Sequence, residues 1–223
     1  MNSPHETIKW TDGREKRVYD ISVPLSSETP IFPGQPSFNK EFIISIAKGD
    51  RGNVSKFLLT SHTGTHVDSP NHFINEMETI DRIPFRTLIG PARVFELAVT
   101  EKIEASDIKP LKIEPGMITL FKTRNSKLWV DKEFRKDYVF FTQEAGEVLR
   151  DFGVAAVGFD YIIPDEFENL KRPFHHVLFR KGIILIEGLN LSQVPAGDYF
   201  IICLPLKIKE GDGAPGRAVL VEW

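Results

Sequence analysis

Histidine and aspartate side chains are concentrated in one short stretch of this 223-residue chain. Five of the six histidines lie in two clusters, at residues 62–72 and 175–176. The first cluster combines three histidines with one carboxylate: His62, His66, Asp68 and His72. Neutral imidazole and carboxylate are ordinary ligands of first-row divalent metals, and such groups are costly to gather without a cation. The first cluster therefore predicts a metal site, whereas the isolated His5 is expected to be an ordinary surface residue.

The backbone of this cluster must bend if one ion is to meet both His62 and His66. Gly64, the threonines around it and Pro70 all disfavour a helix. In a straight strand the two histidine Cα atoms would be about 13 Å apart, at roughly 3.3 Å per residue. Donor atoms on one ion lie within about 4 Å of each other. We therefore expect a bent loop at a strand end, with Gly64 at the bend because glycine bends at the least steric cost.

The composition predicts a single folded domain. Hydrophobic residues make up 41% of the chain, with 17 phenylalanines, which is ample for a buried core. The net charge of −3 and the absence of a basic stripe give no reason to expect a nucleic-acid partner. The apolar runs fall short of the roughly 18 residues of a membrane helix. Residues 1–17 are polar, and the single Cys203 excludes an intrachain disulfide, so we expect a cytoplasmic protein with a buried, unreactive thiol.

The hydrophobic pattern indicates a strand-rich mixed α/β fold. Nine apolar runs predict strands: 42–47, 54–60, 92–98, 117–122, 138–141, 154–159, 183–187, 199–204 and 218–221. One helix is predicted between Thr142 as the N-cap and Gly153 as the stop, which makes a local βαβ unit of residues 138–159. A second helix is predicted over 175–180. Turn-forming Pro and Gly residues near residues 30 and 211 indicate ordered loops rather than a linker.

The first cluster also carries a family resemblance. Its sequence, HTGTHVDSPNH, resembles the HxGTHxDxPxH signature of the cyclase-like metal-dependent hydrolases, which include bacterial-type kynurenine formamidase and isatin hydrolase. Supporting resemblances lie at residues 30–34, 123–126, 185–191 and 211–215. The similarity implies a hydrolase domain at residues 20–223, preceded by a polar extension at residues 1–19. It also implies the family's swivelling β/β/α-type architecture, as one domain with a mixed sheet and few helices.

The resemblance implies a set of five metal ligands for one or two ions per chain: His62, His66, Asp68, His175 and Glu187. The formamidase branch has a histidine twelve residues before the glutamate, which selects His175 over its neighbour His176. His72 corresponds to the family's catalytic general acid and base. Zinc is the expected metal because the ligation is rich in histidine, and manganese is the alternative because two carboxylates also suit it.

The chemistry of these residue types agrees with amide hydrolysis. A divalent metal lowers the pKa of a bound water towards neutrality and stabilises the oxyanion that forms when water attacks a carbonyl. A histidine outside the ligand set, with a pKa of about 6.5, can take a proton from water and return it to the leaving nitrogen. The sequence has no Gly-x-Ser-x-Gly elbow, which disfavours a covalent serine nucleophile.

Four residues are predicted to bind the substrate: Phe32, Trp129, Asn125 and Ser126. The two aromatic rings would form a wall, and the two polar side chains would orient an amide. Phe73 is a further aromatic candidate for which ordinary core packing is favoured. Arg124 stands where the family commonly has glycine, so the resemblance constrains the substrate less than the metal.

Three functions compete at this point. The favoured one is an arylformamidase of tryptophan catabolism that hydrolyses N-formylkynurenine to kynurenine and formate. The alternative is a hydrolase that opens a cyclic amide such as isatin, because a few pocket side chains can change the substrate. The third is a metal-stabilised binding protein without turnover, which the surplus His72 argues against. The resemblance further implies a small-molecule amide substrate and a homo-oligomer, either a dimer or a tetramer.

Overall fold

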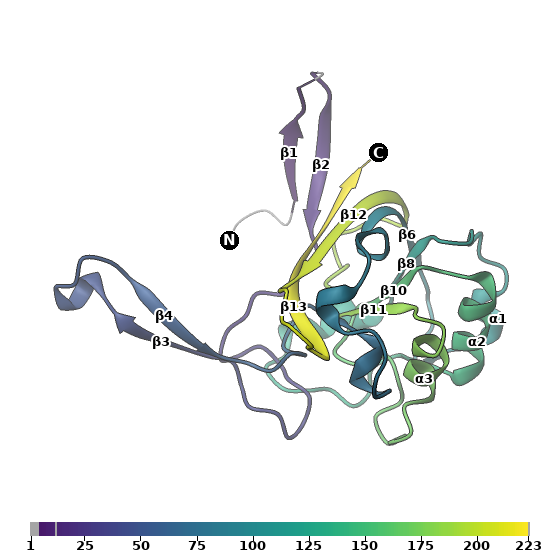
Figure 1. Cartoon of the computed structure of the whole chain (residues 1–223). Coiled ribbons are helices and arrows are strands. Elements are labelled where there is room, and N and C mark those ends of the chain that lie inside the picture. The colour runs from purple at the N-terminus through teal and green to yellow at the C-terminus, as the bar shows by residue number, and fades with distance from the viewer. Residues whose placement is uncertain (1–4, 12, 223) are drawn as a thin grey trace.

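The computed structural model describes residues 5–11 and 13–222, and its main feature is a large mixed β-sheet with helices packed on one side (Figure 1). The strands in this part of the chain are β1 (His5–Lys9), β2 (Glu15–Asp20), β3 (Asn39–Ile44), β4 (Val54–Leu58), β5 (His66–Asp68), β6 (Ile89–Glu96), β7 (Lys102–Ile103), β8 (Ile118–Lys122), β9 (Phe140–Phe141), β10 (Ala156–Phe159), β11 (Ile184–Glu187), β12 (Gly197–Pro205) and β13 (Gly213–Glu222). The α-helices are α1 (Ala105–Ile108), α2 (Gln143–Phe152) and α3 (Pro173–Phe179). Short 3-10 turns lie at η1 (Ile46–Lys48), η2 (Pro70–His72), η3 (Ile80–Arg82), η4 (Phe85–Thr87) and η5 (Arg124–Val130). Among the described residues, no helix is long and apolar enough to span a membrane.

The large sheet closes on itself. Its order is β1-β2-β13-β12-β6-β8-β10-β11-β5, and β5 also pairs with the start of β13. The strands from β13 to β5 therefore form a closed ring, while the hairpin of β1 and β2 extends from the far end of β13. Strands β6, β8, β10 and β11 run parallel to their neighbours in that series, and the other pairs are antiparallel. The predicted strand-rich mixed α/β class is confirmed.

Two apolar clusters fill the molecule, one on each face of the parallel strands. Strand β8 shows how the alternation of side chains divides them, because successive residues point to opposite faces. Ile118 and Leu120 belong to the cluster inside the ring, and Phe121 belongs to the cluster beneath the helices. Cys203 lies in the inner cluster, where burial raises the pKa of its thiol to about 12, as expected of an unreactive core residue.

The helix predicted after Thr142 is confirmed as α2. The Thr142 side chain accepts a hydrogen bond from the Ala145 N–H at 3.2 Å, and Gly153 ends the helix in the left-handed conformation at φ 70°. The second helix, α3, starts two residues earlier than predicted because Pro173 suits its first turn. The βαβ unit differs from the prediction: β9 pairs with β7 in a separate small sheet, whereas β10 lies in the large sheet.

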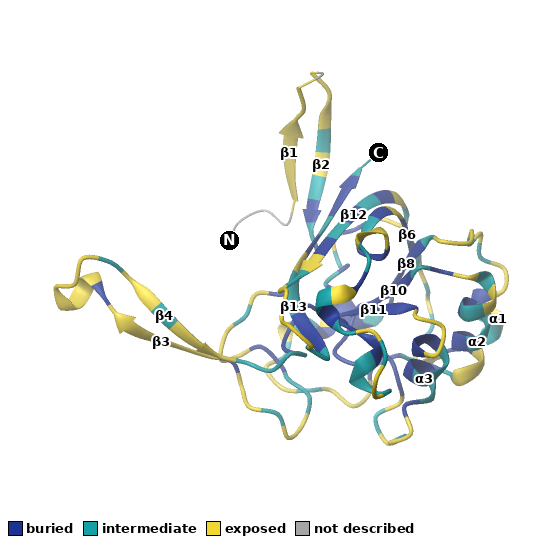
Figure 2. Cartoon of the chain, viewed as in Figure 1, coloured by how far each residue is buried: buried dark blue, intermediate teal, exposed yellow. Residues whose placement is uncertain are grey.

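All nine predicted strand runs overlap a strand of the structure. The hairpin of β1 and β2 was not predicted, because β1 is fully exposed and so lacks a hydrophobic pattern. Its second strand reaches Asp20, at the boundary between the predicted extension and domain, and that division stays a prediction. Strands β3 and β4 form an arm that projects from the body and is largely exposed (Figures 1 and 2).

Candidate metal centre

The segment of residues 61–68 is a bent loop that runs into a strand, as the sequence predicts. Gly64 has φ +68°, and a Cβ atom there would lie 2.3 Å from the Leu25 side chain. Thr65 secures the loop: its hydroxyl donates to the Gly188 carbonyl at 2.6 Å and accepts from the Val23 N–H at 2.9 Å. Strand β5 begins directly afterwards at His66.

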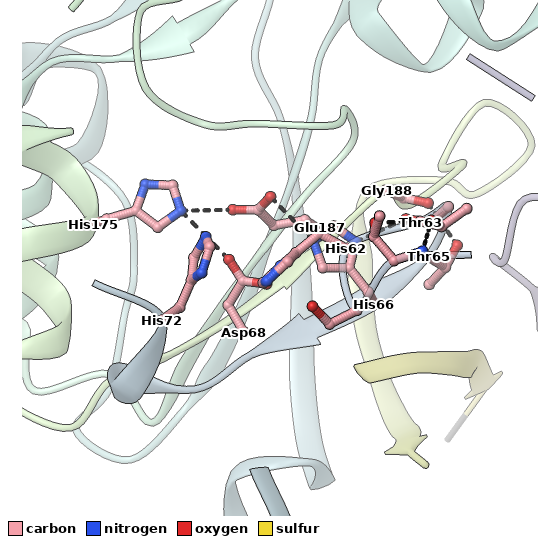
Figure 3. Close-up of polar contacts among 12 residues, drawn as sticks. His62, Thr63, Thr65, His66, Asp68, His72, His175, Glu187 and Gly188 are labelled. Carbon is pink, nitrogen blue, oxygen red and sulfur yellow. Dashed lines mark hydrogen bonds and ion pairs between the residues drawn. The ribbon is translucent and has the colours of Figure 1, made fainter. Parts of the chain in front are cut away.

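The pairing of β5 with β11 brings together residues that are far apart in the sequence. His66 lies opposite Glu187 in this antiparallel register, and Asp68 lies two residues further along the same strand. Because side chains alternate along a strand, His66 and Asp68 share one face of it. All three side chains are buried, and they converge in Figure 3.

The tautomer of His66 follows from its hydrogen bond. Its Nδ1 lies 2.8 Å from the Gly64 carbonyl, which only accepts hydrogen bonds, so Nδ1 carries the proton. The neutral ring then presents a lone pair at Nε2, which is 3.1 Å from Asp68 Oδ1 and 3.5 Å from Glu187 Oε2. Within the described residues, buried His66 Nε2 and Asp68 Oδ2 have no hydrogen-bond partner. A metal ion would satisfy both atoms, because imidazole nitrogen and carboxylate oxygen are ordinary metal ligands.

His175 reaches the same point from helix α3. Its Nδ1 contacts the carboxylate of Asp165, which also accepts the backbone N–H groups of Phe174 at 2.8 Å and of His175 at 3.3 Å. Its Nε2 lies 3.0 Å from Glu187 Oε1 and 3.5 Å from Asp68 Oδ2. A carboxylate behind a histidine fixes the ring and its tautomer, an arrangement common to histidines that bind metals.

His62 and His72 complete the cluster on its other side. His62 lies between two carboxylates: its Nδ1 is 2.7 Å from Asp68 Oδ1 and its Nε2 is 2.7 Å from Asp212 Oδ2. The His72 ring packs on the His62 ring with centroids 3.9 Å apart, and its Nδ1 is 3.6 Å from Asp212 Oδ2. The His72 side chain keeps 26% of its surface exposed, so it is open to solvent in a way that buried His66 is not.

The carboxylates favour positive charge at this centre. Burial lowers the pKa of His62 and of His66, but Asp68 and its neighbouring carboxylates raise these pKa values to about 9 and about 10 respectively. Burial also lowers the pKa of His175, but Asp165 and the other carboxylates raise it well above its usual value. The surrounding histidines outweigh the burial of Asp68 and hold its pKa well below the usual range. A divalent cation can replace these protons, because metal binding requires neutral imidazole and ionised carboxylate.

Two groups of side chains could hold a metal ion. The ligand atoms of His66, Asp68 and Glu187 lie within 4.8 Å of one another, and so do those of His62, Asp68 and His72. Asp68 belongs to both groups, and His175 Nε2 lies next to the first group. The five predicted ligands are therefore brought together, and the residues present fit a divalent metal. Their individual roles as ligands stay predictions.

A cavity of about 220 Å³ opens over this centre. Besides the histidines and carboxylates, its walls are formed by six residues: Phe32, Gln35, Phe73, Ile162, Ile163 and Arg172. The structure thus places the predicted aromatic residue Phe32 at the cavity. Phe73 lies there too, with its ring 4.8 Å from that of His175, although core packing was the favoured expectation for it.

The other three predicted substrate-binding residues do not line this cavity. The Asn125 amide exchanges hydrogen bonds with the backbone of Val139, and the Ser126 hydroxyl donates to Asp160. The Trp129 indole donates to the Leu189 carbonyl at 2.9 Å. All three side chains hold neighbouring loops in place, so this geometry gives no support to their predicted role in substrate binding.

Two other residues, His176 and Arg124, do not line this cavity. His176 is not part of the cavity wall, and its Nδ1 is buried without a hydrogen-bond partner among the described residues. Arg124 donates to the Thr100 carbonyl at 2.9 Å and lines a separate cavity. The sequence reasoning assigned no role to Asp165, Asp212 or Arg172. Asp212 lies in the segment of residues 211–215 that resembles the family, so its importance could have been predicted from the sequence. Nothing in the sequence pattern singled out Asp165 or Arg172.

The chain is similar in sequence to the cyclase family and to kynurenine formamidases. The family model for cyclases matches residues 19–166. The chain is 36% identical to kynurenine formamidase of Salinibacter ruber over 205 residues, covering 91% of this chain and 96% of that one. It is 31% identical to kynurenine formamidase of Bacillus cytotoxicus over 201 residues, covering 90% and 95% of the two chains.

Solved structures show the same fold. A structure described as "predicted metal-dependent hydrolase from Bacillus stearothermophilus" superposes with a TM-score of 0.82 at 33% identity, covering 93% of this chain and 99% of that one. Isatin hydrolase A from Ralstonia solanacearum superposes with a TM-score of 0.82 at 25% identity, covering 93% and 92%.

Proposed function

Because this chain belongs to the cyclase family of hydrolases, we propose that it is a metal-dependent arylformamidase. Its reaction would be hydrolysis of N-formylkynurenine to kynurenine and formate. One observation carries the proposal: a cavity lined by His66 and Asp68, whose buried Nε2 and Oδ2 atoms have no hydrogen-bond partner among the described residues, in a chain similar over nine-tenths of its length to kynurenine formamidases.

The metal would be held by one shared set of side chains: His62, His66, Asp68, His175 and Glu187. Zinc is the proposed ion because histidine dominates the set, with manganese as the alternative. Asp68 would serve two ions, because it belongs to both groups of side chains that could hold one. A divalent metal at this position supplies Lewis acidity, which polarises an amide carbonyl and makes water acidic. The neighbours of the ligands prepare the site, because the Gly64 carbonyl and the Asp165 carboxylate orient His66 and His175 through their Nδ1 atoms.

His72 is proposed as the general acid and base. Its ring lines the cavity, is partly exposed and lies 3.6 Å from the Asp212 carboxylate. It would take a proton from the attacking water and deliver it to the aryl nitrogen as the C–N bond breaks. The leaving aryl amine is then released neutral, and formate remains as the second product. Phe32 and Phe73 line the cavity and would offer apolar surface to the aryl ring.

The alternative function is ring opening of a cyclic amide such as isatin. This function is favoured by the superposition on isatin hydrolase. The same groups would act on the cyclic amide, with the metal centre at the carbonyl and His72 at the ring nitrogen. Metal-dependent turnover of either compound would exclude the third function, a binding protein without catalysis.

Chelator-stripped protein tests these proposals directly. Turnover of N-formylkynurenine and of isatin is measured before and after addition of zinc or manganese. Kynurenine release that depends on added metal supports the arylformamidase and identifies the working ion. Isatin turnover alone supports the alternative. Metal uptake without turnover of either compound refutes both.

We also propose that the protein is a cytoplasmic homo-oligomer. The arm of β3 and β4, which is largely exposed in Figure 2, supports the homo-oligomer. Its exposed large apolar side chains include Phe42, Ile43 and Phe57, at 46%, 59% and 56%. An isolated two-stranded hairpin is marginally stable in water, and apolar surface of this kind marks contacts between proteins. Light scattering tests it: a dimer or tetramer that dissociates in the variant Phe57→Ser supports the proposal, and a monomeric wild type refutes it.

A further inference from the structure

Arg172 occupies an unusual position at the entrance to helix α3. Its backbone lies in the left-handed region, at φ 46° and ψ 55°, which residues other than glycine seldom adopt. The residue is only 7% exposed. Three residues further along the same segment is His175, so the conformation that turns the chain into α3 also sets Arg172 beside the metal centre.

The guanidinium of Arg172 is held on one side only. Its Nη1 donates to the carbonyls of Glu166 at 2.9 Å and of Phe167 at 3.2 Å, and the group lies 5.5 Å from the centre of the Phe32 ring. In the described part of the chain, no hydrogen bond is made by its Nε or Nη2 atom, and no carboxylate lies within ion-pair distance. A largely buried cation without a counter-ion from the described residues is a favourable partner for an anionic ligand.

The free edge of this guanidinium has the geometry of a carboxylate site. Nε and Nη2 of an arginine form a planar fork that matches the two oxygens of a carboxylate. Arg172 lines the same cavity as His66 and Glu187. The imidazole of His66 and the carboxylate of Glu187 belong to the candidate metal centre. An anionic group in that cavity would find Arg172 without a counter-ion, and an aryl ring could pack beside Phe32 in the same wall.

We infer that Arg172 is a substrate-carboxylate site that selects aryl formamides bearing an acidic side chain. The inference rests on the proposed arylformamidase function and deepens it, because N-formylkynurenine carries an α-carboxylate. Isatin is a neutral cyclic amide and offers no group for this fork. The carboxylate would bind Arg172 and the formamide would reach the metal centre, because both line the same cavity.

The test compares N-formylkynurenine with its methyl ester, which differs in that one charge. Cleavage of the formamide is followed by chromatography in the metal-loaded protein, and the ratio of the acid and ester kcat/KM values is the readout. The variant Arg172→Met is expected to lower this ratio by about tenfold or more, as for loss of a charge-assisted hydrogen-bond pair. Arg172→Lys keeps the charge but lacks the planar fork, so its acid-to-ester ratio is expected to lie between those of the wild type and Arg172→Met.

Lys136→Met is the matched control. Like Arg172, Lys136 is a cation near an aromatic ring, with its Nζ 4.3 Å from the centre of the Phe167 ring. Its side chain is 63% exposed and does not line the cavity. Its removal is expected to leave the acid-to-ester ratio at the wild-type value. If Arg172→Met lowers both kcat/KM values equally, Arg172 only supports the loop of residues 166–167 and the inference is overturned.

Failure of the arylformamidase proposal would give a separate result. If the wild type cleaves neither compound, calorimetry with kynurenine and kynurenine methyl ester tests the carboxylate site alone. Binding of the acid at least tenfold tighter than the ester, lost in Arg172→Met, upholds it. Equal affinities overturn it.

Discussion

Gly188→Ala is expected to damage the metal centre without altering any proposed ligand. Gly188 directly follows Glu187 and has φ +70°. A Cβ atom at this position would lie 2.1 Å from the Gly64 carbonyl oxygen and 3.0 Å from the Thr65 Cα. These are backbone atoms, so they cannot give way by a rotamer change. The Gly64 carbonyl is also the acceptor that orients His66, so the clash should be transmitted to the metal site.

The expected loss of unfolding free energy in Gly188→Ala has two parts, and a second glycine with a similar φ separates them. A side chain in the left-handed conformation costs about 1–2 kcal/mol, and overpacking typically adds about 1–3 kcal/mol. Gly182 has nearly the same φ, +69°, but its added Cβ would meet no atom within 4 Å. Gly182→Ala should therefore lower the unfolding free energy by about 1–2 kcal/mol, and Gly188→Ala by about 2–5 kcal/mol. Disturbing the orientation of His66 should also weaken metal binding about 10–100-fold in Gly188→Ala alone.

Urea unfolding of the metal-free proteins measures the first effect, and calorimetric titration with zinc measures the second. The reasoning is refuted if the two alanine variants lose the same unfolding free energy. It is also refuted if Gly188→Ala binds metal as tightly as Gly182→Ala.

Three further predictions concern single side chains. His72→Ala should lower kcat by about 10²–10⁴-fold while keeping the metal, measured by turnover and by metal content; loss of the metal would instead make His72 a ligand. Asp165→Asn should weaken metal binding about 10–100-fold in calorimetry, because the His175 ring loses the carboxylate that orients it, and an unchanged affinity would contradict that role. Burial raises the pKa of Asp160 to about 6, so between about pH 4 and pH 6 the folded protein keeps a proton that the unfolded chain has released. The unfolding free energy should therefore fall by roughly 3 kcal/mol as the pH rises through this range, and urea unfolding should show that Asp160→Asn abolishes this fall; equal pH dependence in both proteins would count against it.

Much of the local structure could be predicted because its causes lie close together in the sequence. Thr142 and Gly153 delimit α2 by capping alone, and nine apolar runs locate strands. The bend at Gly64 followed from the distance between His62 and His66 and the reach of one ion. The hairpin of β1 and β2 escaped prediction, because exposed strands carry no hydrophobic pattern.

The surroundings of the metal centre could not be predicted in the same way. Asn125 and Ser126 have side chains that could bind a substrate. In the structure they donate hydrogen bonds to Val139 and Asp160 instead and hold neighbouring loops in place. Conversely, Asp165 and Arg172 looked like ordinary charged residues, but Asp165 contacts His175 and Arg172 lines the cavity. A side chain's partner is set by which segments pack together, and composition and spacing do not contain that information.

The sequence by itself determined the chemistry of this protein: which imidazoles and carboxylates are available, and where the chain can bend to gather them. The tertiary structure decided the neighbours of those groups. Pairing of β5 with β11 and β13 joins residues 62–72 to residues 184–187 and to the loop at Asp212, and α3 adds His175. These contacts span more than a hundred residues of chain, so they depend on burial of the whole sheet and not on any local pattern.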